Sequence, residues 1–233
     1  ERGSDRDGVA RVHAHGIDVL DGTDDDAVVR LVADDFHFIF LPAQHRLFDQ
    51  HFMDRRKVEA ASDDFVEFLG FINRQLFTGG IQRLETMLMP ANFSSIVGEF
   101  MSTTLPKHAS GLVKNQFHNG HPDLIPAGMF PDNAVRYAHD GIEIKASRYL
   151  RGWQGHNAEA SWLMVFVFDS DRPSHVVGVA KPASFRFRLV AGAQLDVTDW
   201  RFSGRSATSR RTITASVTPT GYQKMTSNWI YRD

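Results

Sequence analysis

The chain has 233 residues, a formal net charge of −2 and no cysteine. The missing thiols exclude disulfides, thiolate zinc sites and thiol nucleophiles, which fits a cytoplasmic protein. Hydrophobic residues make up 42 %, including 18 Phe, enough to fill a sizeable core. No apolar run approaches the roughly 20 residues of a transmembrane helix, so no membrane partner is expected.

The first part of the chain gives few signals. Residues 23–33 are predicted to form a short helix, because Thr23 can cap it and the acidic run that follows suits a positive helix N-terminus. Residues 36–41 are predicted to form a buried strand.

A longer helix is predicted to begin at Ser62, where apolar residues start to recur at helical spacing, and to end at Gly79-Gly80. A shorter helix is expected within 81–89, stopped near a proline. A third is expected from Ser94 or Ser95 to Pro106.

From Asp123 onward the patterns predict strands. Residues 141–146 alternate apolar and polar, and 162–168 form a continuous apolar run, as in a strand buried on both faces. Further strands are expected over 176–180, 185–190, 212–217 and 229–231.

Helices followed by a mixed sheet predict an α/β or α+β fold. We expect one domain over 1–233. It would have a mainly helical part (1–110), a strand core (111–180) and a basic, strand-rich end (181–233).

Two short segments carry the chemistry: Pro122-Asp123 and Glu143-Ile144-Lys145. Glu143 and Lys145 are two apart on a predicted strand, so both project from one face. If Asp123 ends a neighbouring strand, its carboxylate can meet that of Glu143. Two carboxylates and the Ile144 carbonyl would form the oxygen-rich, partly open site that Mg²⁺ prefers.

Such a site suits phosphodiester hydrolysis. The ion would acidify an attacking water and neutralise charge on the phosphate, while Lys145 would position that water or stabilise the developing charge. A simpler alternative stays open: Glu-x-Lys is also common as a solvated salt-bridge pair, and Pro-Asp is an ordinary turn.

These segments resemble the PD-(D/E)XK nuclease superfamily, and more specifically its type II restriction endonucleases. The resemblance covers about 25 residues. It implies a restriction-endonuclease-like core, a mixed sheet flanked by helices, with Asp123 and Glu143 as Mg²⁺ ligands and Lys145 as the catalytic lysine.

Many members of that superfamily add an acidic residue from a preceding helix. Glu99 is the candidate here, because it lies on the flank of the apolar stripe of its predicted helix. Glu85 and Glu67 are competitors, and a solvated helix glutamate is the alternative.

Candidate DNA contacts fall in two polar segments. The connection from 148 to 157 offers side-chain donors, and a segment near the C-terminus interleaves arginines with hydroxyl residues, which suits phosphate and guanine recognition. The alternatives are a long surface connection with Trp153 packed down and a solvent-facing loop. The candidates are Arg148, Arg151, Gln154, His156, Asn157, Arg205, Arg210 and Arg211.

His118 and His121 precede Asp123 at a spacing that can indicate zinc, but the sequence shows no third ligand. The preferred interpretation is a polar contact that orients a ligand of the site, or a contact with phosphate.

The first functional hypothesis is therefore a Mg²⁺-dependent enzyme that cuts double-stranded DNA at a specific sequence, acting as a homodimer because one site cuts one strand. The alternatives are a repair, recombination or phage-type nuclease, a non-catalytic DNA-binding protein, and a small-ligand-binding α+β protein.

Overall fold

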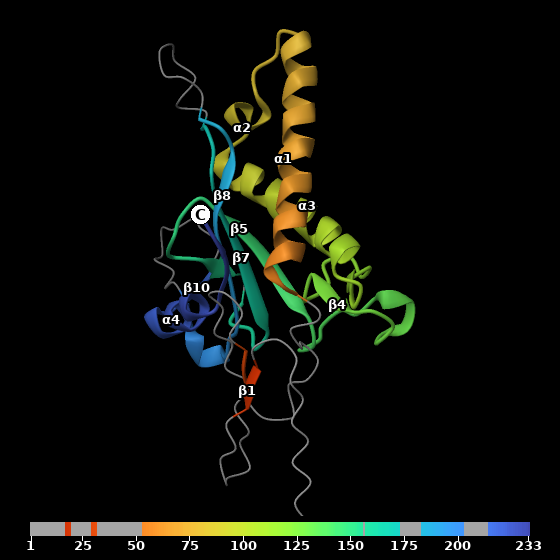
Figure 1. Ribbon diagram of the computed structural model, residues 1–233, viewed down its shortest axis with the longest axis vertical. Helices are drawn as coiled ribbons and strands as arrows, with labels where there is room; N and C mark the ends of the chain where they lie inside the picture. The colour runs from red at the N-terminus through yellow and green to blue at the C-terminus, as the bar shows by residue number, and fades with distance from the viewer. Residues whose placement is uncertain (1–16, 20–28, 32–52, 156, 173–182, 203–213) are drawn as a thin grey trace, which may run out of the picture. The chain divides into compact units, whose positions relative to one another are not determined.

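The computed structural model describes residues 17–19, 29–31, 53–155, 157–172, 183–202 and 214–233 (Figure 1). The chain divides into two compact units, Glu1–Arg46 and Leu47–Asp233.

The first unit contains a short antiparallel pair of strands, β1 (Ile17–Val19) and β2 (Val29–Leu31). The helix predicted over 23–33 is therefore wrong at 29–31. Val29 pairs with Val19, and β-branched residues favour the extended backbone of such a pair over a helix. The strand predicted over 36–41 lies outside the described residues.

The second unit is built on a six-stranded mixed sheet in the order β11-β8-β7-β5-β4-β3. β5 and β7 run parallel, and the other neighbours are antiparallel. The predicted α/β class with a mixed sheet is thus confirmed. The strands are β3 (Leu112–Lys114), β4 (Leu124–Pro126), β5 (Ile142–Ser147), β7 (Trp162–Asp169), β8 (Arg186–Gln194) and β11 (Trp229–Arg232).

A smaller antiparallel sheet has the order β6-β10-β9, from β6 (Gln154–Gly155), β10 (Ala215–Val217) and β9 (Trp200–Phe202). The connection that follows β5 leads into it, and Trp153 in that connection is buried, as one alternative expected. The strand predicted over 176–180 lies outside the described residues.

Three helices precede the main sheet: α1 (Arg55–Thr78), α2 (Leu84–Met87) and α3 (Pro90–His108). α1 begins seven residues before the predicted Ser62, because the Asp54 carboxylate accepts a hydrogen bond from the Lys57 amide and caps the helix there. Its predicted end at Gly79 is confirmed.

The predicted limits of α3 are wrong at both ends. Pro90 is the first helical residue, a position where its missing N–H costs nothing, so it starts α3. Pro106 lies inside the last turn, and the helix continues to His108.

One helix was not predicted: α4 (Pro219–Ser227), whose Thr218 cap accepts a hydrogen bond from the Gly221 amide at 3.2 Å. Two short 3₁₀ segments, η2 (Pro131–Asn133) and η4 (Val197–Asp199), also occur in this unit. None of the helices in the described ranges is long and apolar enough to cross a bilayer.

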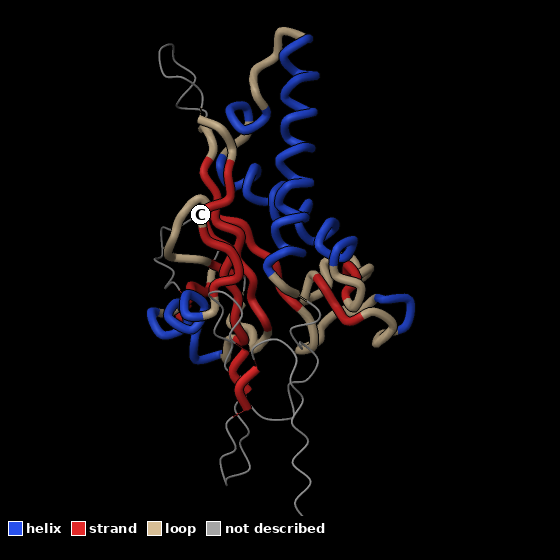
Figure 2. The backbone as a smooth tube through the Cα atoms, viewed as in Figure 1, coloured by secondary structure: helices blue, strands red, loops and turns tan. Residues whose placement is uncertain are grey.

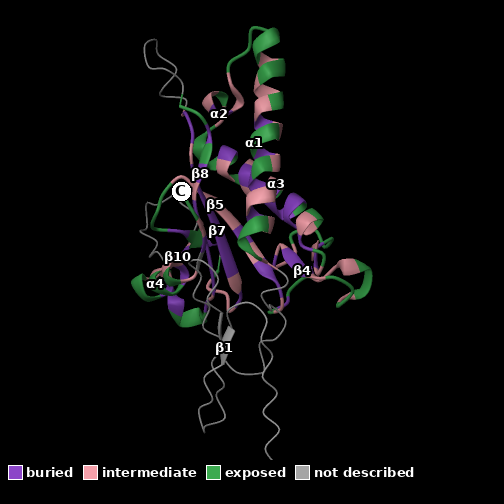
Figure 3. Cartoon of the chain, in the orientation of Figure 1, coloured by how far each residue is buried: buried purple, intermediate pink, exposed green. Residues whose placement is uncertain are grey.

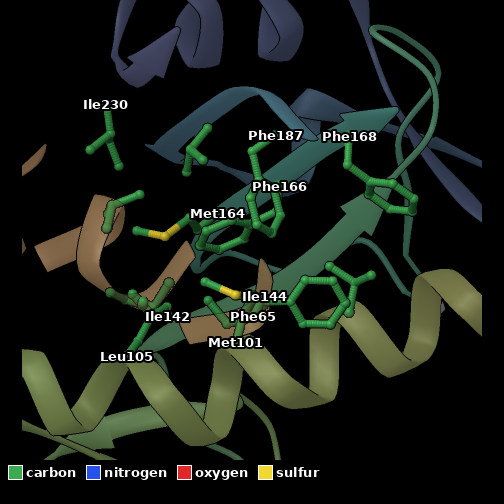
Figure 4. Packing of buried hydrophobic residues seen from close by; sticks show 14 of the residues in the cluster. Phe65, Met101, Leu105, Ile142, Ile144, Met164, Phe166, Phe168, Phe187 and Ile230 are labelled. Carbon is green, nitrogen blue, oxygen red and sulfur yellow. The ribbon is translucent and has the colours of Figure 1, made fainter. Parts of the chain in front are cut away.

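The sheet is covered on both faces, with α1 and α3 on one side and α4 on the other (Figures 1 and 2). β7 alternates between two cores: Met164, Phe166 and Phe168 pack toward α1 and α3 (Figure 4), whereas Leu163 and Val165 pack on the opposite face. This explains its continuous apolar sequence, and Figure 3 shows β7 buried through most of its length.

Candidate active site

The site begins where β4 and β5 separate. The two strands are paired only at Leu124 and Ile142. Asp123 immediately precedes β4, and its Oδ2 atom accepts a hydrogen bond from the Ile144 amide at 2.8 Å. Asp123 therefore lies beside the edge of β5, at one end of the neighbouring strand β4, as expected.

Glu143 and Lys145 project from one face of β5, as predicted from the alternation. The Lys145 ammonium donates to Oε1 of Glu143, whereas Ile142 and Ile144 enter the core beneath α3. The Glu143 side chain is only 14 % exposed and that of Lys145 30 %, so the pair differs from a solvated surface salt bridge.

The balance of burial and neighbouring charges raises the pKa of Asp123 and of Lys145 and lowers that of Glu143. Burial of Asp123, together with the nearby Glu143 charge, raises the pKa of Asp123 to about 6. Burial disfavours the charge on Glu143, but the hydrogen bond from His121 and the charge of Lys145 outweigh it and lower the Glu143 pKa to about 2. Burial also opposes the charge on Lys145, yet Glu143 and Asp123 raise its pKa, so the ammonium persists.

The expected ligand role of the Ile144 carbonyl agrees with the backbone geometry. Ile144 donates its N–H to Asp123, and the N–H and C=O of one strand residue point to the same edge. The Ile144 carbonyl therefore faces the edge of β5 at which Asp123 lies.

A cavity of about 550 Å³ adjoins this edge. It includes Asp123 and Lys145, and its walls come from α3, β5, the connection after β5 and the strand β10 region. The other lining residues are Ala91, Ser94, Ser95, Gly98, Glu99, Ser102, Ile144, Ala146, Ser147, Tyr149, Gly152, Trp153, Gln154, Gly155, Val165 and Thr214.

Glu99 lines this cavity from α3, with a side chain that is 71 % exposed and paired to Lys114 at 2.8 Å. Its competitors do not line the cavity. Glu85 is fully buried and pairs with Arg83, a structural contact, and Glu67 is exposed on α1. Of the three, Glu99 is the one that lines the cavity.

Asn115 is a structural residue of the site that the sequence did not reveal. Its buried amide donates to the carbonyls of Pro122 (3.1 Å) and Val135 (2.8 Å) and accepts from the amides of Phe117 and Val135 (both 3.0 Å). These bonds fix the segment that carries Asp123. A lone Asn after a short strand offers no sequence signal for this role.

His121 and Glu159 were also missed as a pair. Nδ1 of His121 lies 3.0 Å from Oε2 of Glu143 and 3.2 Å from Oε2 of Glu159, and its ring stacks on Tyr137. His118 is exposed and is not part of this group. The groups nearest to His121 are therefore two carboxylates distant in sequence, and together the three residues could hold a metal ion.

The predicted DNA contacts are placed differently from one another. The Arg148 guanidinium donates to the carbonyls of Ser170 (2.9 Å) and Asp171 (3.1 Å) and packs over two Phe rings. Its contacts are therefore within the protein. Arg151 is exposed over Tyr222.

Two further candidates flank the site. Gln154 lines the cavity and donates to Ser216 at 3.4 Å, and Asn157 donates to Glu159 at 3.5 Å. The remaining four lie outside the described residues: His156, Arg205, Arg210 and Arg211.

Comparisons of the chain with protein-family models, with curated proteins and with solved structures gave no match.

Proposed function

We propose that the protein is a Mg²⁺-dependent endodeoxyribonuclease with a restriction-endonuclease-like core of the PD-(D/E)XK type. The observation that carries this proposal is the convergence of Asp123, Glu143 and Lys145. Asp123 accepts a hydrogen bond from the amide of Ile144, which stands between Glu143 and Lys145, and Lys145 donates to Glu143. Asp123 and Lys145 line the cavity beside the point where β4 and β5 separate.

The donor set suits Mg²⁺. The Glu143 charge contributes to the raised pKa of Asp123. The Asp123 carboxylate bonds the amide of Ile144, the residue next to Glu143, and the Ile144 carbonyl faces the same edge. Hard oxygen donors with room for water and phosphate are what Mg²⁺ prefers. When bound, the ion would acidify water and offset charge on the phosphate.

The side chains around these carboxylates have separate tasks. Lys145, held protonated by Glu143, can hydrogen-bond an attacking water or a phosphate oxygen and stabilise the negative charge that develops on it. His121 orients the other oxygen of Glu143. Glu99, on the α3 wall of the cavity, can accept a hydrogen bond from a bound water.

Double-stranded DNA is the proposed substrate, cut at a specific sequence as by a type II restriction enzyme. Exposed Arg151 and Gln154 lie in the connection that lines the cavity. Arg210 and Arg211 precede Thr214, another cavity residue, by four and three positions in sequence. Cutting both strands calls for a homodimer, and we propose a cytoplasmic location.

The test is incubation of the purified chain with plasmid DNA and Mg²⁺, with EDTA as control, followed by run-off sequencing of the ends. Discrete ends at one palindromic sequence are expected. Progressive degradation from ends would instead favour a repair or phage-type nuclease. Binding without cleavage would leave only a DNA-binding protein.

A further inference from the structure

The imidazole of His121 lies between two carboxylates. Its Nδ1 atom is 3.0 Å from Oε2 of Glu143 and 3.2 Å from Oε2 of Glu159. We propose that these three residues, the His121 cluster, form a second divalent-cation site that favours Zn²⁺, Co²⁺ or Mn²⁺ over Mg²⁺. This inference goes beyond the proposed function and does not rest on it, because it concerns ion binding alone.

The spacing of the donor atoms is that of a coordination shell. Two ligands 2.0–2.1 Å from a tetrahedral ion lie roughly 3.3 Å apart, close to the two distances from Nδ1. One ligand atom from each residue lies within 4.8 Å of the other two, so small side-chain rotations close the shell. Three protein ligands would leave a fourth position open, as in catalytic zinc sites.

The charge around the cluster favours a cation. Glu143 and Glu159 are 14 % and 17 % exposed, and Asp123 is close by, so three largely buried carboxylates share one neighbourhood. Lys145 supplies one positive charge against them. With neutral His121 an excess of two negative charges remains, which one divalent ion bound at Nδ1 would neutralise.

The donor types select among ions. An imidazole nitrogen with two carboxylate oxygens suits zinc, cobalt and manganese, whereas Mg²⁺ prefers oxygen ligands throughout. The Asp123 edge of β5 offers oxygens alone and the His121 cluster offers nitrogen. Oε1 of Glu143 pairs with Lys145 and Oε2 lies against His121, so Glu143 belongs to the His121 cluster through Oε2.

The three ligands are held by the fold. His121 is bridged to Tyr137 through the backbone and stacks on its ring at 5.5 Å. The Glu159 carbonyl accepts a hydrogen bond from the Trp200 indole at 2.9 Å, and Glu143 lies on β5. An ion would therefore find its donors already positioned, and their residual exposure gives it access.

The test is titration of the full chain with Co²⁺, followed by visible absorption, in which tetrahedral sites absorb much more strongly than octahedral ones. The variants are His121→Gln, Glu159→Gln and Asp123→Asn, with His118→Gln as the matched control. We expect wild type and His118→Gln to bind one ion with intense absorption. Asp123→Asn should keep that absorption and bind only slightly more weakly, because Asp123 adds negative charge but is not a ligand of the cluster. His121→Gln and Glu159→Gln should bind more than about tenfold more weakly.

Equal Co²⁺ affinity in wild type and Glu159→Gln would overturn the inference, as would a loss in Asp123→Asn as large as that in Glu159→Gln. Circular dichroism checks folding, and Glu159, in a connection before β7, keeps the test valid if His121→Gln unfolds. Plasmid cleavage in Mg²⁺ is scored separately. If the plasmid stays intact but Co²⁺ binding depends on the His121 cluster, only the nuclease proposal is rejected. If the plasmid is cut but Co²⁺ binding does not depend on the cluster, only the second cation site is rejected.

Discussion

The carboxylate of Asp123 accepts a hydrogen bond from the amide of Ile144, although 21 residues separate them. Ile144 stands between Glu143 and Lys145, so this contact holds Asp123 next to both of them in space. Changes that disturb the packing of β4 on β5 should therefore act on the whole site.

Gly141→Ala is the sharpest test of that packing. Gly141 has φ +155°, and a Cβ there would collide with the Pro122 ring and the Leu124 carbonyl. We expect loss of both stability and cleavage, because Asp123 lies between those two residues. Gly128→Ala is the control, since it shares a positive φ but meets no atom within 4 Å. Equal effects of the two on cleavage would contradict the argument.

Lys145→Ala and Glu143→Gln should each lower Mg²⁺-dependent cleavage by at least about 100-fold, because the first removes the proposed charge-stabilising ammonium and the second a proposed ligand of the ion. DNA binding, measured by fluorescence anisotropy in Ca²⁺, should persist. Lys107→Ala, an exposed lysine of α3 outside the cavity lining, should cleave normally. Cleavage retained in both site variants would rule out this active site.

Asp123→Asn should stabilise the metal-free protein at neutral pH. The folded-state pKa of about 6 exceeds the ordinary 3.8, so the stability from the neutral carboxyl is present below about pH 3.8 and lost as pH rises through about 6. The difference corresponds to about 3 kcal/mol.

Melting temperatures in EDTA between pH 4 and pH 8 test this. The two proteins should melt alike near pH 4 and diverge above pH 6, with the variant higher. Mg²⁺ should then stabilise wild type more than the variant. A constant offset across the pH range would refute the electrostatic explanation.

Phe65→Ala should cost about 3–5 kcal/mol of unfolding free energy, because Phe65 is fully buried and packs against the rings of Phe93 and Phe187. Phe71→Ala, on the same helix but 52 % exposed, should cost less than about 0.5 kcal/mol. Urea unfolding of both variants measures the difference, and equal losses of unfolding free energy would contradict the stabilising role of Phe65 in the core.

Arg148→Ala and Arg151→Ala should separate folding from DNA contact. Arg148 donates to two carbonyls and packs over Phe93 and Phe168, so its loss should cost about 2 kcal/mol or more of stability. Because Arg151 is exposed, Arg151→Ala should leave the stability unchanged and weaken DNA binding. Anisotropy and urea unfolding together check both outcomes.

Much of the second half of the chain could be predicted from periodicity. The alternation at 141–146 and the apolar run at 162–168 specify β5 and β7, because each is decided by which faces are buried. The limits of the helices were harder to predict from the sequence. Pro90 can stop one helix or start the next, and only the packing of α3 shows which. Thr218-Pro219, a capping residue followed by a proline at the first helical position, is a local signal for the start of α4.

Local periodicity also made part of the site predictable. Glu143 and Lys145 share a strand, so local spacing places them together. Glu159 and Asn115 reach the site through the fold, across connections whose course no local pattern encodes. Arg148 shows the converse: a cation next to the site in sequence turned inward.

The early separation of β4 from β5 leaves main-chain groups of Ile144 and Ala146 facing the cavity. Part of what a ligand meets there is therefore peptide backbone, which is the same whatever side chain is attached. Alanine scanning would leave this part of the surface intact and understate its share of binding. Replacing the Ala146 amide by an ester, through chemical synthesis of that segment, would measure the contribution of this backbone group to ligand binding.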